Sequence, residues 1–220
     1  MALTDLLNDG FIHLVDSMGD DMSAVRAARV SYGKKTKGKE ADKKLIDYLL
    51  ENKHETPFEM ITFTFHVRCP LFIARQWFRH RIGSFNEVSR RYTTVNATDF
   101  WFPESWRTND RANKQSSSSL EMSDEEILYL HKIYNDALDE SKKTYEKLIE
   151  AGVAREQARA VLPMAAYTEF YWSVNARSLF NFLRLRMHES AQEEIQVYAN
   201  RILEIVKPIA PWTFECFDNL

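Results

Sequence analysis

The run M-I-T-F-T-F-H-V-R-C at residues 60–69 decides the fold. Every second residue from Ile61 onward is apolar, and every second residue from Thr62 to Arg68 is polar. Because successive side chains of a strand point to opposite faces, this alternation predicts a strand with one buried face. Residues 167–175 alternate in the same way and predict a second long strand.

Segments with helical spacing or turn signals surround these two strands. A shorter strand is expected at residues 10–16. Helices are expected at residues 22–30, 43–51, 123–151, 155–162 and 177–187, with one more that opens at Pro70 as its first residue. Half-buried strands are typical of antiparallel sheets, whereas parallel strands are apolar throughout. We therefore predict an α+β, helix-rich fold in which an antiparallel β-sheet is flanked by long helices.

Capping signals mark the ends of two of the helices. Ser123 and Glu126 have the spacing of a capping box, and Gly152 is placed to stop the helix that begins there. Ser190 and Glu193 have the same spacing, so a second capping box is predicted at the start of the last long helix.

Length and composition favour one folded unit. The chain has 220 residues, of which 45% are hydrophobic, so residues 1–220 are predicted to form a single domain. Residues 101–119 are polar and include four consecutive serines. They predict a long variable loop.

The charge and the cysteines limit the partners that are expected. The formal net charge is −3, so neither nucleic acid nor a membrane surface is an expected partner. The sequence has no uninterrupted apolar run near 18 residues, and it shows no signal-peptide pattern, so no membrane span is predicted. The two cysteines form no disulfide framework, and no Cys/His spacing indicates a metal site. We expect a cytoplasmic protein without a metal.

Positive charge gathers in the run R-H-R-I-G-S-F-N-E-V-S-R-R-Y at residues 79–92. It contains four arginines and one histidine against Glu87 as the single acid. Arginine pairs with phosphate through a planar fork and stacks on aromatic rings. The chain has no G-x-G-x-x-G turn for a dinucleotide, so side chains would have to hold one. Further arginines for this purpose lie at residues 155–159 and 175–186.

The motif R-H-R-x7-S, from Arg79 to Ser89, resembles the signature of the flavin-dependent thymidylate synthases. The segments H-E-T-P-F-E at residues 54–59, A-R-Q-W-F-R-H-R at residues 74–81 and V-N-A-R-S-L at residues 174–179 are also similar to that family. The resemblance implies a methyltransferase that converts dUMP to dTMP. It implies methylenetetrahydrofolate as the carbon donor and co-substrate, FAD as the cofactor, NADPH as the reductant and tetrahydrofolate as a product. It also implies a homotetramer with active sites where subunits meet.

The resemblance assigns roles to residues that match the family's motifs. It implies cofactor contacts for Thr56, Arg79, His80, Arg81, Glu87, Asn175, Ala176, Arg177 and Asn181. It implies substrate contacts for Gln76, Trp77, Phe78, Arg79, Glu87, Val88, Ser89, Arg90, Arg91, Arg159 and Arg186. Arg186 is implied as the catalytic residue, placed against the pyrimidine ring, where its charge would raise the electron density at C5.

The nucleophile that methylation at C5 requires can arise in two ways, by thiolate addition at C6 or by electrostatic polarisation. Cys69 lies in the apolar register of a strand and Cys216 lies near the C-terminus, so neither is expected to be an activated thiolate. Ser89 has no predictable base beside it. We interpret Ser89 as a ligand of the nucleotide.

Two other classes of protein fit parts of the sequence. A module that binds single-stranded RNA or phosphate could use residues 79–91, with Phe85 and Tyr92 as stacking platforms. A helical interaction protein could pair its arginines with acidic helices, since residues 121–150 are rich in acids. Oligonucleotide binding that weakens steeply with salt would favour the first class. Loss of stability without loss of ligand binding on changing Arg79 or Arg186 would favour the second.

Overall fold

The structure is a computed structural model that describes residues 6–30, 33, 37–89, 91, 100–109, 117–120 and 122–217. The strands are β1 (Phe11–Met18), β2 (Thr62–Pro70), β3 (Ser84–Glu87), β4 (Arg107–Asn109), β5 (Ser117–Ser119) and β6 (Tyr167–Asn175). The α-helices are α1 (Asp21–Arg29), α2 (Lys39–Glu51), α3 (Leu71–Trp77), α4 (Asp124–Glu150), α5 (Arg155–Ala158), α6 (Ala176–Arg186), α7 (Glu193–Val206) and α8 (Pro211–Phe214). Short 3-10 helices also lie in the described part of the chain, among them η2 (Thr56–Met60), η3 (Arg159–Val161) and η4 (Glu215–Phe217).

A four-stranded antiparallel sheet in the order β1-β2-β6-β3 forms the centre of the molecule. The predicted strand at residues 60–69 is confirmed as β2, and the residues from Ile61 to Cys69 that were predicted to face the core are all fully buried. In β6, Trp172 pairs with Phe65 of β2 on one side and with Phe85 of β3 on the other. The two alternating runs are therefore the two central strands.

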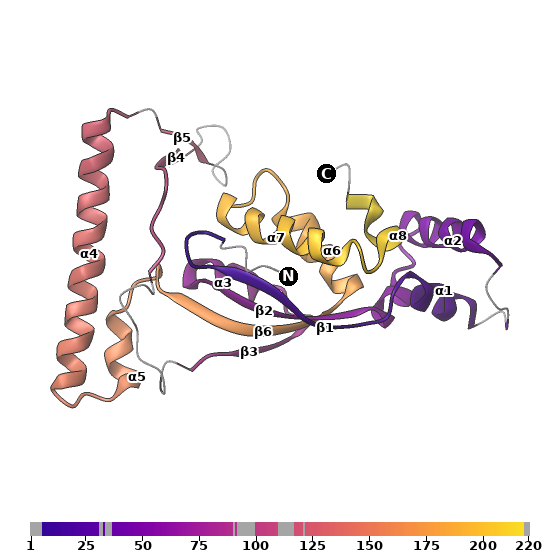
Figure 1. Cartoon of the computed structure of the whole chain (residues 1–220), viewed down its shortest axis with the longest axis horizontal. Coiled ribbons are helices and arrows are strands. Elements are labelled where there is room, and N and C mark those ends of the chain that lie inside the picture. The colour runs from indigo at the N-terminus through magenta and orange to yellow at the C-terminus, as the bar shows by residue number, and fades with distance from the viewer. Residues whose placement is uncertain are drawn as a thin grey trace.

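The core lies between one face of this sheet and the helices α3, α6 and α7, which lie along the same face in Figure 1. Trp77 of α3 is fully buried there and contacts Trp172, Phe182 and Tyr198 with ring centroids 4.8–5.8 Å apart. The α+β class with an antiparallel sheet is confirmed. The sheet was predicted to be flanked by long helices, and α3, α6 and α7 all lie on the same face of it.

The helix α4 is the longest element, with 27 residues, and it stands away from the sheet in Figure 1. Ser123 and Glu126 form the predicted capping box, and Gly152 follows the helix with φ +82°. A glycine suits this left-handed conformation because a Cβ would be strained there. Tyr145 packs with Ala158 of α5 in a small cluster of its own.

Two predicted helix starts are wrong. Pro70 is the N-cap of α3 and the last residue of β2, so it precedes the helix instead of opening it. Ser190 is not the N-cap of α7, which is Gln192. The Ser190 amide instead donates to Nδ1 of His188, and this local turn delays the start of the helix.

Two segments in which no strand was predicted contain short strands. In the long loop predicted at residues 101–119, β4 and β5 pair as a two-stranded sheet, while residues 110–116 lie outside the described part. In the basic segment at residues 79–92, β3 is the edge strand beside β6. Both are held by backbone pairing, which leaves no periodic signal in three or four residues.

In the described part of the chain, the helices are either too short or too polar to span a bilayer.

Candidate active site

The Arg-His-Arg triplet follows the C-terminus of α3. The helix ends at Trp77, and the His80 amide then donates to the Trp77 carbonyl at 2.9 Å. This turn directs the His80 ring inward, where it is 9% exposed and lies edge-on to Phe182. Arg79 and Arg81 are exposed on either side. The triplet therefore presents two cations outward and anchors one imidazole inside.

Gly83 carries the chain from the triplet into β3. A Cβ at this position would lie 2.9 Å from Nε1 of Trp172 and 3.0 Å from the carbonyl oxygen of Ser173. Any other residue would push the segment away from the sheet, so this glycine permits the close approach. The segment that follows the triplet therefore packs directly against β6.

A cleft of about 470 Å³ opens beside the triplet. It lies where β6 ends and α6 begins, next to η2. Its walls are Glu55, Glu59, Arg79, His80, Arg81, Ile82, Asn175, Arg177, Ser178 and Asn181. Six residues that were predicted to contact the cofactor come together here from two distant parts of the sequence: Arg79, His80, Arg81, Asn175, Arg177 and Asn181.

The charges in the cleft fall into two groups. Arg177 pairs with Glu59 and lies 3.8 Å from a carboxylate oxygen of Glu55. Arg79 and Arg81 have no carboxylate within ion-pair distance in the described part of the chain. The N-terminus of α6 points at the same space, and a helix N-terminus carries partial positive charge. One end of the cleft is therefore suited to an anion.

Arg186 lies at the end of α6 and is held from two directions. Its Nε donates to Nε2 of His80 at 3.0 Å, and its Nη2 donates to the carbonyl oxygen of Gln76 at 3.1 Å. Burial, and then the charge of Arg186, lower the pKa of His80 to about 4. His80 is therefore neutral at pH 7, and its Nε2 is free to accept the hydrogen bond.

The guanidinium of Arg186 remains a cation in this environment. Burial lowers the pKa of Arg186, but an arginine side chain stays protonated in proteins. The Gln76 side chain in turn donates to Oε1 of Gln192 at 2.6 Å. Arg186 is thus a fixed positive charge at the rear of the triplet.

A second group of predicted residues lies at the opposite end of β6. Oε1 of Glu87 accepts a hydrogen bond from Thr168 at 2.7 Å, and the Val88 amide donates to the Glu169 carbonyl at 2.8 Å. Arg91 pairs with Glu156 of α5 at 3.0 Å. Thr168, which contacts Glu87, and Asn175 of the cleft are seven strand residues apart, roughly 24 Å along β6. Ser89 is half-buried there, and Arg159 is exposed on η3.

Several predicted site residues take other positions. Thr56 is exposed on η2 and does not line the cleft. Ala176 and Trp77 are fully buried, main chain included, so neither is open to a ligand in the described chain. Phe78 is half-buried against Phe85 and Phe170, and Arg90 lies outside the described residues.

The prediction also missed four residues that line the cleft, Glu55, Glu59, Ile82 and Ser178. Glu55 and Glu59 belong to the H-E-T-P-F-E segment that carried the resemblance, and Ser178 belongs to V-N-A-R-S-L. A signal was therefore present in the same motifs. Ile82 is exposed and apolar, and nothing in its local pattern marked it.

The described residues that line the cleft include neither a cysteine nor a group of side chains suited to hold a metal ion. Burial raises the pKa of the Cys69 thiol well above its usual value, as its place in the apolar register predicted. In the described ranges, no three His, Cys, Asp or Glu side chains are grouped to hold a metal ion.

The chain is similar to known proteins over most of its length. Residues 13–212 match the family described as thymidylate synthase complementing protein. The chain is 58% identical over 212 residues to the flavin-dependent thymidylate synthase of Thermosipho melanesiensis, a match that covers 96% of this chain and 92% of that protein. This chain belongs to the flavin-dependent thymidylate synthase family.

Other members and a solved structure extend the family likeness. A flavin-dependent thymidylate synthase of Thermus thermophilus is 47% identical over 214 residues, covering 97% of this chain and 77% of that one. The structure of the UMP/dUMP methylase PolB from Streptomyces cacaoi, bound with 5-Br dUMP, has a TM-score of 0.86 and 32% identity, covering 96% of each chain. The predicted membership in the flavin-dependent thymidylate synthase family is confirmed.

Proposed function

We propose that this chain is a thymidylate synthase that methylates dUMP at C5 to give dTMP, with methylenetetrahydrofolate as carbon donor and tetrahydrofolate as product. FAD, when bound and reduced by NADPH, would supply the hydride that completes the methyl group. The observation that carries the proposal is the fixed cation Arg186, which is held by His80 and Gln76 at the rear of the Arg-His-Arg segment.

The cleft fits the flavin cofactor by its donor set. Arg79 and Arg81 are exposed cations that can pair with a diphosphate, and the N-terminus of α6 adds partial positive charge. Asn181 offers amide groups for the polar edge of a ring. Glu55 and Glu59 offer acceptors for hydroxyl or amino groups. We assign these residues to FAD, and we retain Thr56, Glu87 and Ala176 as contacts that an assembled site would have to bring closer.

The pyrimidine of dUMP is assigned to Arg186, Gln76 and Phe78, and the fully buried Trp77 anchors this segment in the core. A fixed positive charge beside the ring stabilises the negative charge that develops on the ring during the reaction. This stabilisation is stronger in a partly buried site than in water. Because the Cys69 thiol is buried and neutral, polarisation by Arg186 replaces a thiolate adduct as the route to a nucleophilic C5.

The phosphate of dUMP is assigned to the group at the other end of β6, namely Glu87, Val88, Ser89, Arg91 and Arg159, and the substrate contact predicted for Arg90 is retained. The described Arg91 and Arg159 are exposed cations, and the Ser89 hydroxyl accepts the Arg91 amide at 3.4 Å. In this assignment Ser89 orients the loop and holds substrate instead of acting as a nucleophile.

We assign the complete site to more than one copy of the chain. Asn175 of the cleft and Thr168, which contacts Glu87 of the phosphate group, lie roughly 24 Å apart along β6, so one chain holds the two groups at opposite ends of this strand. A homotetramer, in which the phosphate group of one subunit faces the cleft of another, resolves this separation. Residues 1–220 then act as one domain that contributes to more than one site.

The proposal is tested with purified protein, FAD, dUMP, methylenetetrahydrofolate and NADPH under anaerobic conditions. We expect a flavin absorption band that bleaches with NADPH, and dTMP that forms only when all components are present. Protein that binds no flavin after incubation with excess FAD, or that binds it and forms no dTMP, would refute the proposal. Gel filtration with light scattering checks for a mass of four chains.

A further inference from the structure

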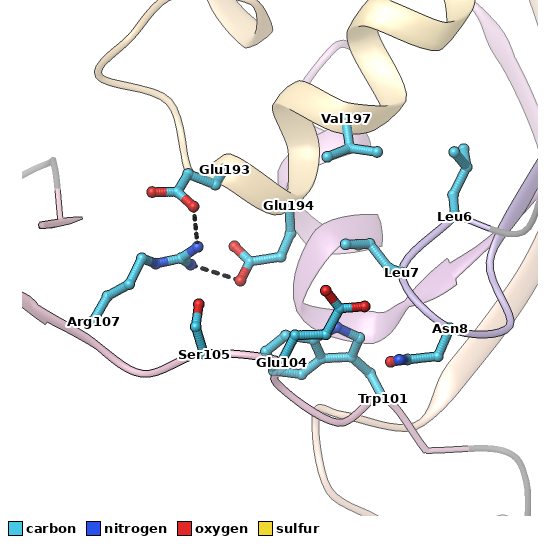
Figure 2. A pocket seen from close by; sticks show the side chains of 10 residues that line it. All are labelled: Leu6, Leu7, Asn8, Trp101, Glu104, Ser105, Arg107, Glu193, Glu194 and Val197. Atoms are coloured by element: carbon cyan, nitrogen blue, oxygen red, sulfur yellow. Dashed lines mark hydrogen bonds and ion pairs between the residues drawn. The ribbon is translucent and has the colours of Figure 1, made fainter. Parts of the chain in front are cut away.

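Arg107 joins the β4–β5 hairpin to the first turn of α7 through two carboxylates. Its Nη1 lies 2.6 Å from Oε2 of Glu193, and its Nη2 lies 2.6 Å from Oε1 of Glu194. Figure 2 shows the guanidinium between the two acids, at one side of a pocket that Leu7 and Trp101 help to line. None of these residues belongs to the cleft beside the triplet.

The same turn of α7 reaches the active site from its other side. Gln192, the N-cap residue directly before Glu193, accepts the hydrogen bond of the Gln76 side chain at 2.6 Å. The Gln76 carbonyl accepts the hydrogen bond of Arg186 at 3.1 Å. A short series of contacts therefore leads from Arg107 through the first turn of α7 to the cation assigned to the chemistry.

We propose that Arg107 is a positioning residue for the reaction: its bridge to Glu193 and Glu194 holds the first turn of α7 so that Gln192 fixes Gln76 and Gln76 fixes Arg186. The inference rests on the proposed function, because it assigns Arg107 to the geometry of that same site. Arg107 itself touches neither substrate nor cofactor in this assignment.

The two carboxylates contribute unequally to the bridge. The Glu194 side chain is 7% exposed, and its Oε2 has no hydrogen-bond partner in the described part of the chain. The Glu193 side chain is 58% exposed. Without Arg107, Glu194 would be a buried charge with no cation, and the turn would have to move toward water to solvate it. Glu193 would be solvated without any movement.

The matched control is Arg201, on the same helix. Its Nη1 pairs with Glu204 at 2.6 Å, and its side chain is 20% exposed, against 19% for Arg107. The Arg201 pair lies within α7 and, among the described residues, bonds to neither Gln192 nor Gln76. Arg107→Gln and Arg201→Gln therefore remove one charge each at similar burial, but only the first loosens the turn before the site.

The experiment compares both variants with the unchanged protein in flavin content, thermal midpoint, and kcat and KM for dUMP. We expect both to bind FAD, and we expect kcat of Arg107→Gln to fall about tenfold, since displacement of a catalytic group by about 1 Å costs up to about 100-fold. Arg201→Gln should keep kcat within about twofold. Equal kcat values for the two variants at equal flavin content would overturn the inference.

Two further measurements separate positioning from a loss of folding. Glu194→Gln should lower kcat more than Glu193→Gln. The kcat of Arg107→Lys should lie between those of Arg107→Gln and the unchanged protein, since an ammonium cannot bridge two carboxylates as the planar guanidinium does. In a double-mutant cycle, Arg107→Gln added to Gln192→Ala should lower kcat little further. Additive losses would refute the route through Gln192. If the unchanged protein makes no dTMP, the proposed function fails first.

Discussion

The side chain of Arg186 donates its Nε hydrogen to Nε2 of His80 at 3.0 Å, a contact between residues 106 positions apart. The bond requires a neutral imidazole, because a protonated His80 would place a second donor against the guanidinium. Burial ensures this state by lowering the pKa of His80 to about 4. The histidine of the motif thus supports the arginine at the end of α6, while its two arginine neighbours face the cleft.

Arg186→Lys should separate chemistry from cofactor binding. A lysine keeps the charge but cannot donate to both His80 and Gln76 in the planar arrangement seen here. We expect dTMP formation to fall about 100-fold or more, the scale measured when one preorganised donor is lost, while FAD remains bound. The measurements are kcat and the flavin absorbance per chain.

Arg184→Lys is the matched control for that change, because Arg184 lies on the same helix and its side chain is half-exposed. Its Nη1 lies 3.4 Å from Oε1 of Glu55. It should retain most of the activity. Full turnover in Arg186→Lys would remove Arg186 from the catalytic role.

His80 should make the fold sensitive to mild acid. The folded protein takes up this proton only near pH 4, whereas the unfolded chain takes it up near pH 6.5. Stability is therefore lost as the pH falls from 6.5 to 4, by about 3 kcal/mol at most, since one unit is worth about 1.4 kcal/mol. Urea unfolding at pH 7, 6, 5 and 4.5 measures this loss as a change in the free energy of unfolding.

His80→Gln offers the comparison for this pH dependence, because a glutamine side chain can accept the Arg186 hydrogen bond and does not titrate. Its free energy of unfolding should fall less steeply between pH 6.5 and 4.5 than that of the unchanged protein. Identical slopes for the two proteins would exclude His80 as the titrating group.

Arg81→Ala should weaken flavin binding. Arg81 is an exposed cation on the wall of the cleft and has no carboxylate partner in the described chain, so its charge is available to an anionic cofactor. We expect Kd for FAD to rise about tenfold, and the loss should shrink as salt is raised. Titration of cofactor-free protein with FAD measures it.

Arg75→Ala is the control for the flavin titration, since Arg75 is an exposed arginine on α3 outside the cleft. It should leave Kd unchanged. An equal loss in both variants would indicate a general effect of net charge and would contradict the assignment of the cleft.

Trp77 should matter for folding and not for the recognition of dUMP. The side chain is fully buried among Trp172, Phe182 and Tyr198, so truncation to alanine should cost about 3–5 kcal/mol of unfolding free energy. Trp77→Phe keeps most of the apolar volume and should retain the KM for dUMP. A large rise of KM in a stable Trp77→Phe protein would show that the indole does reach the substrate.

Alternation and capping made much of the fold predictable from local sequence. Residues 60–69 and 167–175 became β2 and β6 because each has a period-two pattern over most of its length. The box of Ser123 and Glu126 likewise marked the start of α4. By contrast, β3, β4 and β5 were missed, because an edge strand of three or four residues is stabilised by its neighbour's backbone and needs no pattern of its own.

The candidate site divides in the same way. The motif from Arg79 to Ser89 and the segment around Asn175 contain most of the residues that line the cleft. They could be found in the sequence because each is a contiguous segment. Glu55 and Glu59 became visible as lining residues only in three dimensions, where η2 lies against α6. Likewise, the bridge of Arg107 could not be predicted, because its partners are 86 and 87 positions away.

By itself the sequence determined the antiparallel α+β class, the central strands and the family, because periodicity and motifs are properties of neighbouring residues. Only the tertiary structure decided that His80 is neutral and that Trp77 belongs to the core. It also decided that the two ends of the motif lie at opposite ends of β6. Burial and distance set the pKa of a group and its partners, and both arise only when segments far apart in the chain pack together.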